Sequence, residues 1–127
     1  MPWPHDGRME PSDESFYEIK ARVISVLANP KRLQIVEILG KSERTVTELA
    51  EELDIAQATT SQHLAVMRKT GVVETRKEAN FVYYRLADPK IADACAVMSR
   101  AIVDLLVGQQ EKLRPVLAGA RRHGSGP

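Results

Sequence analysis

Cysteine occurs only once in this chain of 127 residues, at Cys95. A single cysteine excludes a disulfide within the chain and any metal site built from paired cysteines, and it favours a reducing, cytoplasmic environment. The sequence also lacks a run of about 18 apolar residues, and its start lacks a basic segment followed by an apolar one. It therefore predicts neither a membrane span nor a signal peptide.

Aromatic residues make up only 5% of the chain, so its core has to come from aliphatic side chains, which suit helices better than sheets. The hydrophobic share of 43% and the charged share of 28% are typical of a soluble globular protein. The length suits one domain. We expect a mainly helical domain over residues 13–112, between a disordered, proline-rich leader (1–12) and a flexible, polar tail (113–127).

Acidic residues are absent from Ile55 to Val73, although the net charge of the whole chain is only +1. Residues 10–54 contain ten acidic and six basic side chains, whereas residues 55–90 contain three and six. The distribution of charge indicates nucleic-acid binding better than its total does. A nucleic-acid contact is therefore expected in the second half of the domain.

Two helices are predicted before this region. Apolar residues at helical spacing predict the first over residues 13–28, and Asn29-Pro30 is a typical cap and first position for the second, which runs to about Gly40. The expected core positions are Phe16, Ile19, Val23 and Leu27, followed by Leu33, Val36 and Leu39 or their neighbours.

A helix-turn-helix is predicted next. Thr45 and Glu48 have the spacing of a capping box, which starts a short third helix ending near Leu53. After a break of three residues, a fourth helix is expected from Gln57 to about Thr70, closed by Gly71. Two short helices joined by such a turn are typical of DNA-binding proteins.

A β-hairpin and a long last helix complete the predicted architecture. Residues 72–76 and 82–86 are rich in β-branched and aromatic side chains and predict two strands. After Pro89 a last helix is expected to about Lys112. Its apolar stripe indicates burial against another helix: Ile91, Cys95, Met98, Ile102 and Leu105. The fold class is a winged helix-turn-helix, in the order α-α-α-α-β-β-α.

The fourth helix has one apolar and one small, polar face. Thr60, Leu64 and Met67 share the inner face, and the outer face carries Ala58, Ser61, Gln62, Ala65 and Lys69. Glutamine and serine can hydrogen-bond to base edges in the major groove, where acidic residues would repel phosphates. Arg76, Lys77 and Asn80 in the hairpin could reach phosphates or the minor groove, or they could simply solvate a surface hairpin.

Five motifs in this order resemble the ArsR/SmtB family of dimeric winged-helix repressors, over roughly residues 15 to 106. The motifs are residues 27–33 (LANPKRL), 47–50 (TELA), 57–64 (QATTSQHL), 68–73 (RKTGVV) and 82–86 (VYYRL). The resemblance implies a homodimer joined by its first and last helices, which binds an inverted-repeat operator and releases it when an effector is sensed.

The resemblance also implies site residues. Four residues match positions of the recognition helix that face bases: Gln57, Thr59, Ser61 and Gln62. The hairpin matches the wing that contacts the DNA backbone. With the adjoining side chains, the expected DNA-binding set is Gln57, Thr59, Ser61, Gln62, His63, Arg68, Lys69, Arg76, Lys77 and Asn80. The family often has serine where Ala56 stands, so the helix start is either less rigid or capped by Asp54 after a shifted turn.

The metal sites of the family are not intact in this sequence. Thr45-Val46-Thr47 replaces a Cys-Val-Cys core, and hydroxyls cannot replace thiolates as ligands for soft metals. The positions of the last-helix zinc site read Asp88, Lys90, Ala101 and Asp104, without either imidazole. His63 lies in the recognition segment, and His5 and His123 lie in the predicted tails. We therefore expect no bound metal of these kinds.

Cys95 leaves two interpretations open. On the apolar stripe it can be a small buried hydrophobe, or it can be a thiol that senses oxidants, reactive sulfur, a soft metal or heme across a dimer. A repressor without an effector and a protein-interaction module that has lost DNA binding also remain alternatives. An enzyme is the weakest hypothesis, because no nucleophile, phosphate loop or paired acids occur at a meaningful spacing.

Overall fold

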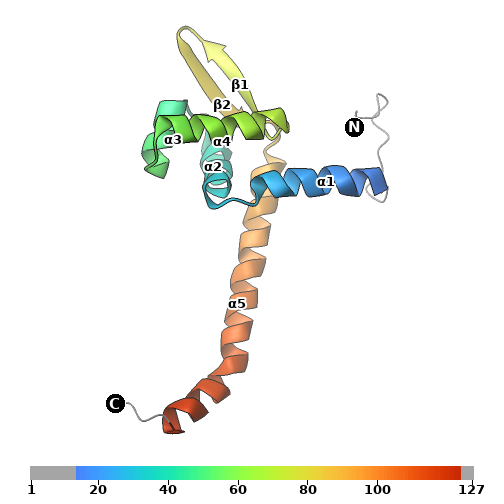
Figure 1. The fold of residues 1–127 in the computed structure, drawn as a ribbon, viewed down its shortest axis with the longest axis vertical. Helices are drawn as coiled ribbons and strands as arrows, with labels where there is room; N and C mark the ends of the chain where they lie inside the picture. Colours follow the sequence, from blue (N-terminus) through green and yellow to red (C-terminus); the bar gives the residue numbers. More distant parts are fainter. Residues whose placement is uncertain (1–13, 124–127) are drawn as a thin grey trace. The chain divides into compact units, whose positions relative to one another are not determined.

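The computed structural model describes residues 14–123, so the predicted leader over 1–12 lies outside the described residues. Figure 1 shows four helices, a hairpin and a long last helix in the predicted order. The elements are α1 (Glu14–Leu27), α2 (Pro30–Lys41), α3 (Val46–Leu53), α4 (Gln57–Lys69), β1 (Val73–Glu78), β2 (Phe81–Leu86) and α5 (Lys90–His123). The chain forms two compact units, one up to Ala92 and one from Asp93.

The core of the first unit lies between α2, α3, α4 and the base of the hairpin. Its largest fully buried side chains are Ile35, Val36, Leu49, Thr60, Leu64, Met67 and Val73. α1 contributes Ile19, the one buried side chain of that helix. Leu33 was expected in the core but is 46% exposed, and Ile35 takes its place because it lies on the face of α2 that the neighbouring helices cover.

Local signals in the sequence set the helix ends where they were predicted. The Oδ1 atom of Asn29 accepts hydrogen bonds from the backbone N–H groups of Lys31 (2.9 Å) and Arg32 (3.2 Å). Thr45 and Glu48 form the predicted capping box. Gly71 has φ +82°, a conformation that glycine adopts without strain. These residues thereby set the ends of α2, α3 and α4.

The hairpin is longer and its turn tighter than the sequence predicted. β1 and β2 pair antiparallel from Val73↔Leu86 to Glu78↔Phe81, so only Ala79 and Asn80 form the turn. Ala79 has φ +52°, which is unusual for a residue with a side chain and which a sequence pattern does not reveal. At the base, Arg44 and Tyr84 exchange two backbone hydrogen bonds of 3.1 and 2.8 Å. The segment between α2 and α3 thereby pairs with the wing.

The last helix continues past the predicted end at Lys112 to His123 and contains Pro115. Leucine, alanine and arginine, which favour helix, make up most of residues 113–123 and extend it into the predicted tail. Exposed apolar side chains of this helix are Val97, Met98, Ile102, Val103, Leu105, Leu106, Val107, Leu113 and Val116. They include most of the predicted stripe. None of the helices described between residues 14 and 123 has the length and apolar character to cross a membrane.

Candidate nucleic-acid interface

The two faces of α4 differ as the sequence predicted. Thr60, Leu64 and Met67 are the buried residues of the helix. The outer residues are exposed: Ala58, Thr59, Ser61, Gln62, Ala65, Arg68 and Lys69. This side of the helix therefore presents small and polar groups, followed by two cations in the last turn.

The start of α4 has no side-chain cap. Ala56 is the N-cap residue and makes no capping hydrogen bond, while Asp54 instead ends α3 in a left-handed conformation (φ +54°). Gln57 at the first position donates from its Nε2 atom to Oγ1 of Thr47 on α3, over 3.1 Å. Of the two expectations for this start, the shifted cap by Asp54 is wrong, because Asp54 is already used by the preceding helix.

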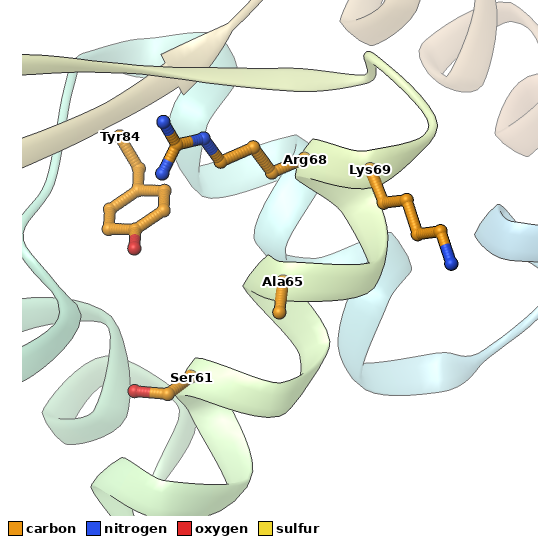
Figure 2. Close-up of a pocket in the computed structure, with 5 residues that line it drawn as sticks. All are labelled: Ser61, Ala65, Arg68, Lys69 and Tyr84. Carbon is orange, nitrogen blue, oxygen red and sulfur yellow. The ribbon is translucent and has the colours of Figure 1, made fainter.

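A hollow of about 440 Å³ lies beside α4 and is lined by Ser61, Ala65, Arg68, Lys69 and Tyr84. Figure 2 shows Ser61, Arg68 and Tyr84 directed to one side of the helix, whereas Lys69 points away from Arg68 and Tyr84. Tyr84 on β2 was not among the predicted site residues. The pair Tyr83-Tyr84 in the last strand could have indicated it. Consecutive residues of a strand face opposite sides, so one tyrosine of the pair lies on each face of the hairpin.

His63 is half-buried on the flank of α4 rather than on its outer face. Its Nδ1 atom accepts a hydrogen bond from Nε of Arg32 on α2, over 3.1 Å. Burial, and then the nearby Arg32 charge, lower the pKa of His63 below its usual value. The imidazole is therefore neutral near pH 7, and it links the recognition segment to α2.

Arg76, the first predicted wing cation, is held by two carboxylates. Its guanidinium binds Glu43 (2.7 Å) and Glu78 (2.6 Å) and lies over the ring of Tyr83, 4.7 Å from the centroid. The hydrogen bonds from Arg76 lower the pKa of Glu43 and keep this carboxylate charged. Arg76 thus ties β1 to the segment before α3, whereas Lys77 and Asn80 at the tip are exposed.

Three residues at the family's metal positions have structural roles here. Thr45 caps α3, Thr47 accepts the hydrogen bond from Gln57, and Oδ1 of Asp88 accepts one from the backbone N–H of Lys90 at 2.8 Å. Within the described part of the chain, no three histidine, cysteine or acidic side chains come together as a metal site would require. Cys95 is a free, half-buried cysteine.

An exposed helix preceded by a capped helix and followed by a two-stranded wing defines the winged helix-turn-helix class of DNA-binding proteins. Comparison with known proteins agrees. Residues 29–75 match the family model described as "Bacterial regulatory protein, arsR family". The HTH-type transcriptional regulator Rv0081 of Mycobacterium tuberculosis is 34% identical over 107 residues, covering 84% of this chain and 94% of that protein.

Other relatives differ in their regulatory effect. A biofilm growth-associated repressor of Agrobacterium fabrum is 46% identical over 72 residues, covering 57% of this chain and 62% of that protein. The transcriptional activator HlyU of Vibrio cholerae is 36% identical over 107 residues, covering 84% of this chain and 92% of that protein.

Solved structures share the fold. The crystal structure of Rv0081 superposes with a TM-score of 0.69 at 34% identity, covering 76% of this chain and 98% of that one. The homodimeric winged helix-turn-helix DNA-binding domain of Mb0332 from Mycobacterium bovis superposes with a TM-score of 0.65 at 31% identity. The match covers 76% of this chain and 88% of that one. The chain described here belongs to the arsR family of bacterial regulatory proteins, and it is a helix-turn-helix transcriptional regulator that binds DNA.

Proposed function

We propose that this protein is a homodimeric repressor that binds an inverted-repeat operator in the cytoplasm and leaves it when an effector binds. It acts by occupying DNA and not by catalysis. The observation that carries the proposal is the outer face of α4, which is exposed, bears no acidic side chain and lies beside the hollow with Arg68 and Tyr84. A surface helix without a DNA partner would normally carry glutamate on such a face.

The contacts to DNA divide into two kinds. Thr59, Ser61 and Gln62 read base edges in the major groove, with Gln57 at the helix start held by Thr47. Arg68, Lys69, Lys77 and Asn80 contact the phosphate backbone and fix the register. The Arg68 guanidinium faces the same hollow as Tyr84, which suits a phosphate group between helix and wing.

Two predicted DNA contacts take indirect roles in this proposal. Arg76 would have to leave Glu43 and Glu78 to reach a phosphate, so it positions the wing instead. His63 is engaged by Arg32 and supports the orientation of α4. Both residues act through the elements that carry the direct contacts.

A homodimer is supported by the apolar side chains of α5. Met98, Ile102 and Leu105 are 60%, 47% and 59% exposed in the single chain, a costly arrangement for large apolar groups in water. A second copy that packs the same stripe would cover them, and it would present two α4 helices to two half-sites.

The test compares Gln62→Ala with Lys77→Ala on the operator and on random duplex DNA. Loss of a base contact by Gln62→Ala should weaken operator binding by about 1 to 3 kcal/mol and spare random DNA. Loss of a phosphate contact by Lys77→Ala should weaken both and reduce the salt slope by about one. Fluorescence anisotropy over a range of salt concentrations measures each quantity.

Three results would contradict the proposal. Equal effects of both substitutions on both DNAs would show that the roles are wrongly assigned. If neither DNA binds with a salt-dependent affinity, the alternative of a winged-helix protein-interaction module is favoured. Deletion of the gene should raise transcription from the operator promoter, whereas a fall in transcription would identify an activator.

A further inference from the structure

A second hollow lies on the other side of α4, between α4 and α1. It has a volume of about 400 Å³, within the usual range of small-molecule sites. Its apolar lining is formed by Ile19, Val23, Val26 and Val66, and Thr70 also lines it. Val66 remains 38% exposed, so the groove is open to a ligand in the single chain.

The charged side chains of this α1–α4 groove have one sign. Arg22 from α1 and Lys69 from α4 line it, and no acidic residue within 14–123 does. Across the described residues, neither cation forms a salt bridge or a side-chain hydrogen bond, whereas Arg44, Arg76 and Arg85 all pair with glutamates. An apolar lining with two cations and no acidic side chain among the described residues is complementary to an anion that carries an apolar group.

Lys69 connects the groove to the DNA-binding face. It lines both the α1–α4 groove and the hollow beside Tyr84, and its side chain points away from Arg68 in Figure 2. A bound anion would draw Lys69 into the groove and neutralise a cation otherwise available to a DNA phosphate. Occupation of the groove would therefore lower the affinity for DNA.

We propose that the α1–α4 groove binds a small amphipathic carboxylate, with its carboxylate between Arg22 and Lys69 and its aliphatic tail on Ile19, Val23, Val26 and Val66. Arginine and lysine form charge-assisted hydrogen bonds with carboxylates, and burial of each methylene adds to the affinity. The regulatory part of this inference rests on the proposed function, because it makes the ligand an effector that weakens DNA binding.

The ligand site is tested without DNA, by calorimetric titration of the full chain with octanoate as the probe. Octanol keeps the tail without the charge, and acetate keeps the charge without the tail, so both should bind at least tenfold more weakly. Arg22→Gln and Lys69→Gln should each weaken octanoate binding at least tenfold. Lys20→Gln is the matched control, because Lys20 is an exposed cation of α1 that does not line the groove.

Three results would overturn the site. Failure of octanoate to bind shows that the groove does not take an amphipathic carboxylate and leaves it to another occupant, such as a second copy of the chain. Equal binding of octanol and octanoate, or equal losses in Lys20→Gln and Arg22→Gln, shows that the two cations do not select the ligand. Thermal unfolding of each variant establishes that the substitution leaves the fold intact.

A second measurement separates this site from the proposed function. Random duplex DNA is titrated with wild type and Arg22→Gln, each with and without octanoate. Octanoate should lower the affinity of wild type several-fold and reduce its salt slope by about one, since one cation is withdrawn, and it should leave Arg22→Gln unaffected. DNA binding that ignores octanoate, with octanoate still bound, refutes the coupling alone. Absence of DNA binding in the untreated protein refutes the proposed function instead.

Discussion

A long-range contact determines the role of His63 in the recognition segment. From the sequence it was a candidate for either a structural role or a phosphate contact, and it accepts a hydrogen bond from Arg32, 31 positions earlier in the chain. A histidine held neutral by burial and by a neighbouring guanidinium cannot attract a phosphate with its own charge. Its expected role is to hold α4 on α2.

The lowered pKa of His63 predicts a dependence of stability on pH. The unfolded chain binds a proton at this residue near pH 6.5, where the folded chain does not. The free energy of unfolding should therefore fall as the pH drops from about 7.5 through 6.5 toward the lowered folded value. Urea denaturation at a fixed protein concentration measures it.

His63→Gln is the control for this prediction, since glutamine still offers an acceptor to Arg32 but does not titrate. The difference between the two proteins removes the contribution of other histidines. Glu43, Glu48 and Asp88, whose pKa values are lowered, titrate below this window and do not interfere. Parallel pH profiles of wild type and His63→Gln would contradict the assignment.

Cys95 is half-buried on the apolar stripe of α5, where either packing or sensing is chemically possible. As a small apolar group it should tolerate Cys95→Ser with unchanged operator affinity in reducing buffer. We expect the affinities of the two proteins to stay equal after exposure to hydrogen peroxide, persulfide, thiophilic metals or heme. Release of DNA by wild type alone under any of these treatments would instead identify the thiol as the sensor.

At the scale of the elements, the two helices of the helix-turn-helix start in different ways. α3 begins with a complete capping box, whereas α4 begins at Ala56 without a side-chain cap. The first N–H groups of α4 therefore depend on solvent, on the DNA or on neighbouring groups. Gln57, which binds Thr47 over 3.1 Å, is the side chain that joins the two helix starts.

This difference predicts opposite effects for two substitutions at the caps. Thr45→Ala should lower the free energy of unfolding by about 1 kcal/mol, because it removes the acceptor for the Glu48 N–H. Ala56→Ser should raise it by up to about 1 kcal/mol, because serine supplies the missing acceptor. Urea denaturation measures both. A neutral or destabilising Ala56→Ser would mean that other groups already satisfy the start of α4.

For the whole molecule, the exposed apolar residues of α5 predict an oligomer. Light scattering should give a mass of about twice 14.1 kDa for the wild type. Ile102→Glu should shift the protein toward the monomer, because it would bury a charge in the helix interface.

Arg100→Glu is the matched control for the dimer prediction. It introduces the same side chain at an exposed position two residues away, off the predicted stripe. Its mass should stay that of a dimer. A monomeric wild type at micromolar concentration, or equal dissociation of the two variants, would contradict dimerisation through this stripe.

The sequence by itself was enough to determine the kind, order and most ends of the elements. The signals at Asn29-Pro30, Thr45 with Glu48, and Gly71 act between residues at most a few positions apart, so their outcome depends little on the rest of the fold. The buried face of α4 was predictable for the same reason, since helical periodicity places Thr60, Leu64 and Met67 together.

Only the tertiary structure decided which charged side chains are paired within the protein and which remain available to a ligand or to DNA. The pairing of Arg76 with Glu43, of His63 with Arg32, and the meeting of Tyr84 with α4 join residues far apart in the sequence. The same holds for the groove that brings Arg22 beside Lys69. Such contacts depend on how the elements pack, because a pattern along one helix or strand does not specify which side chains of another element will face it.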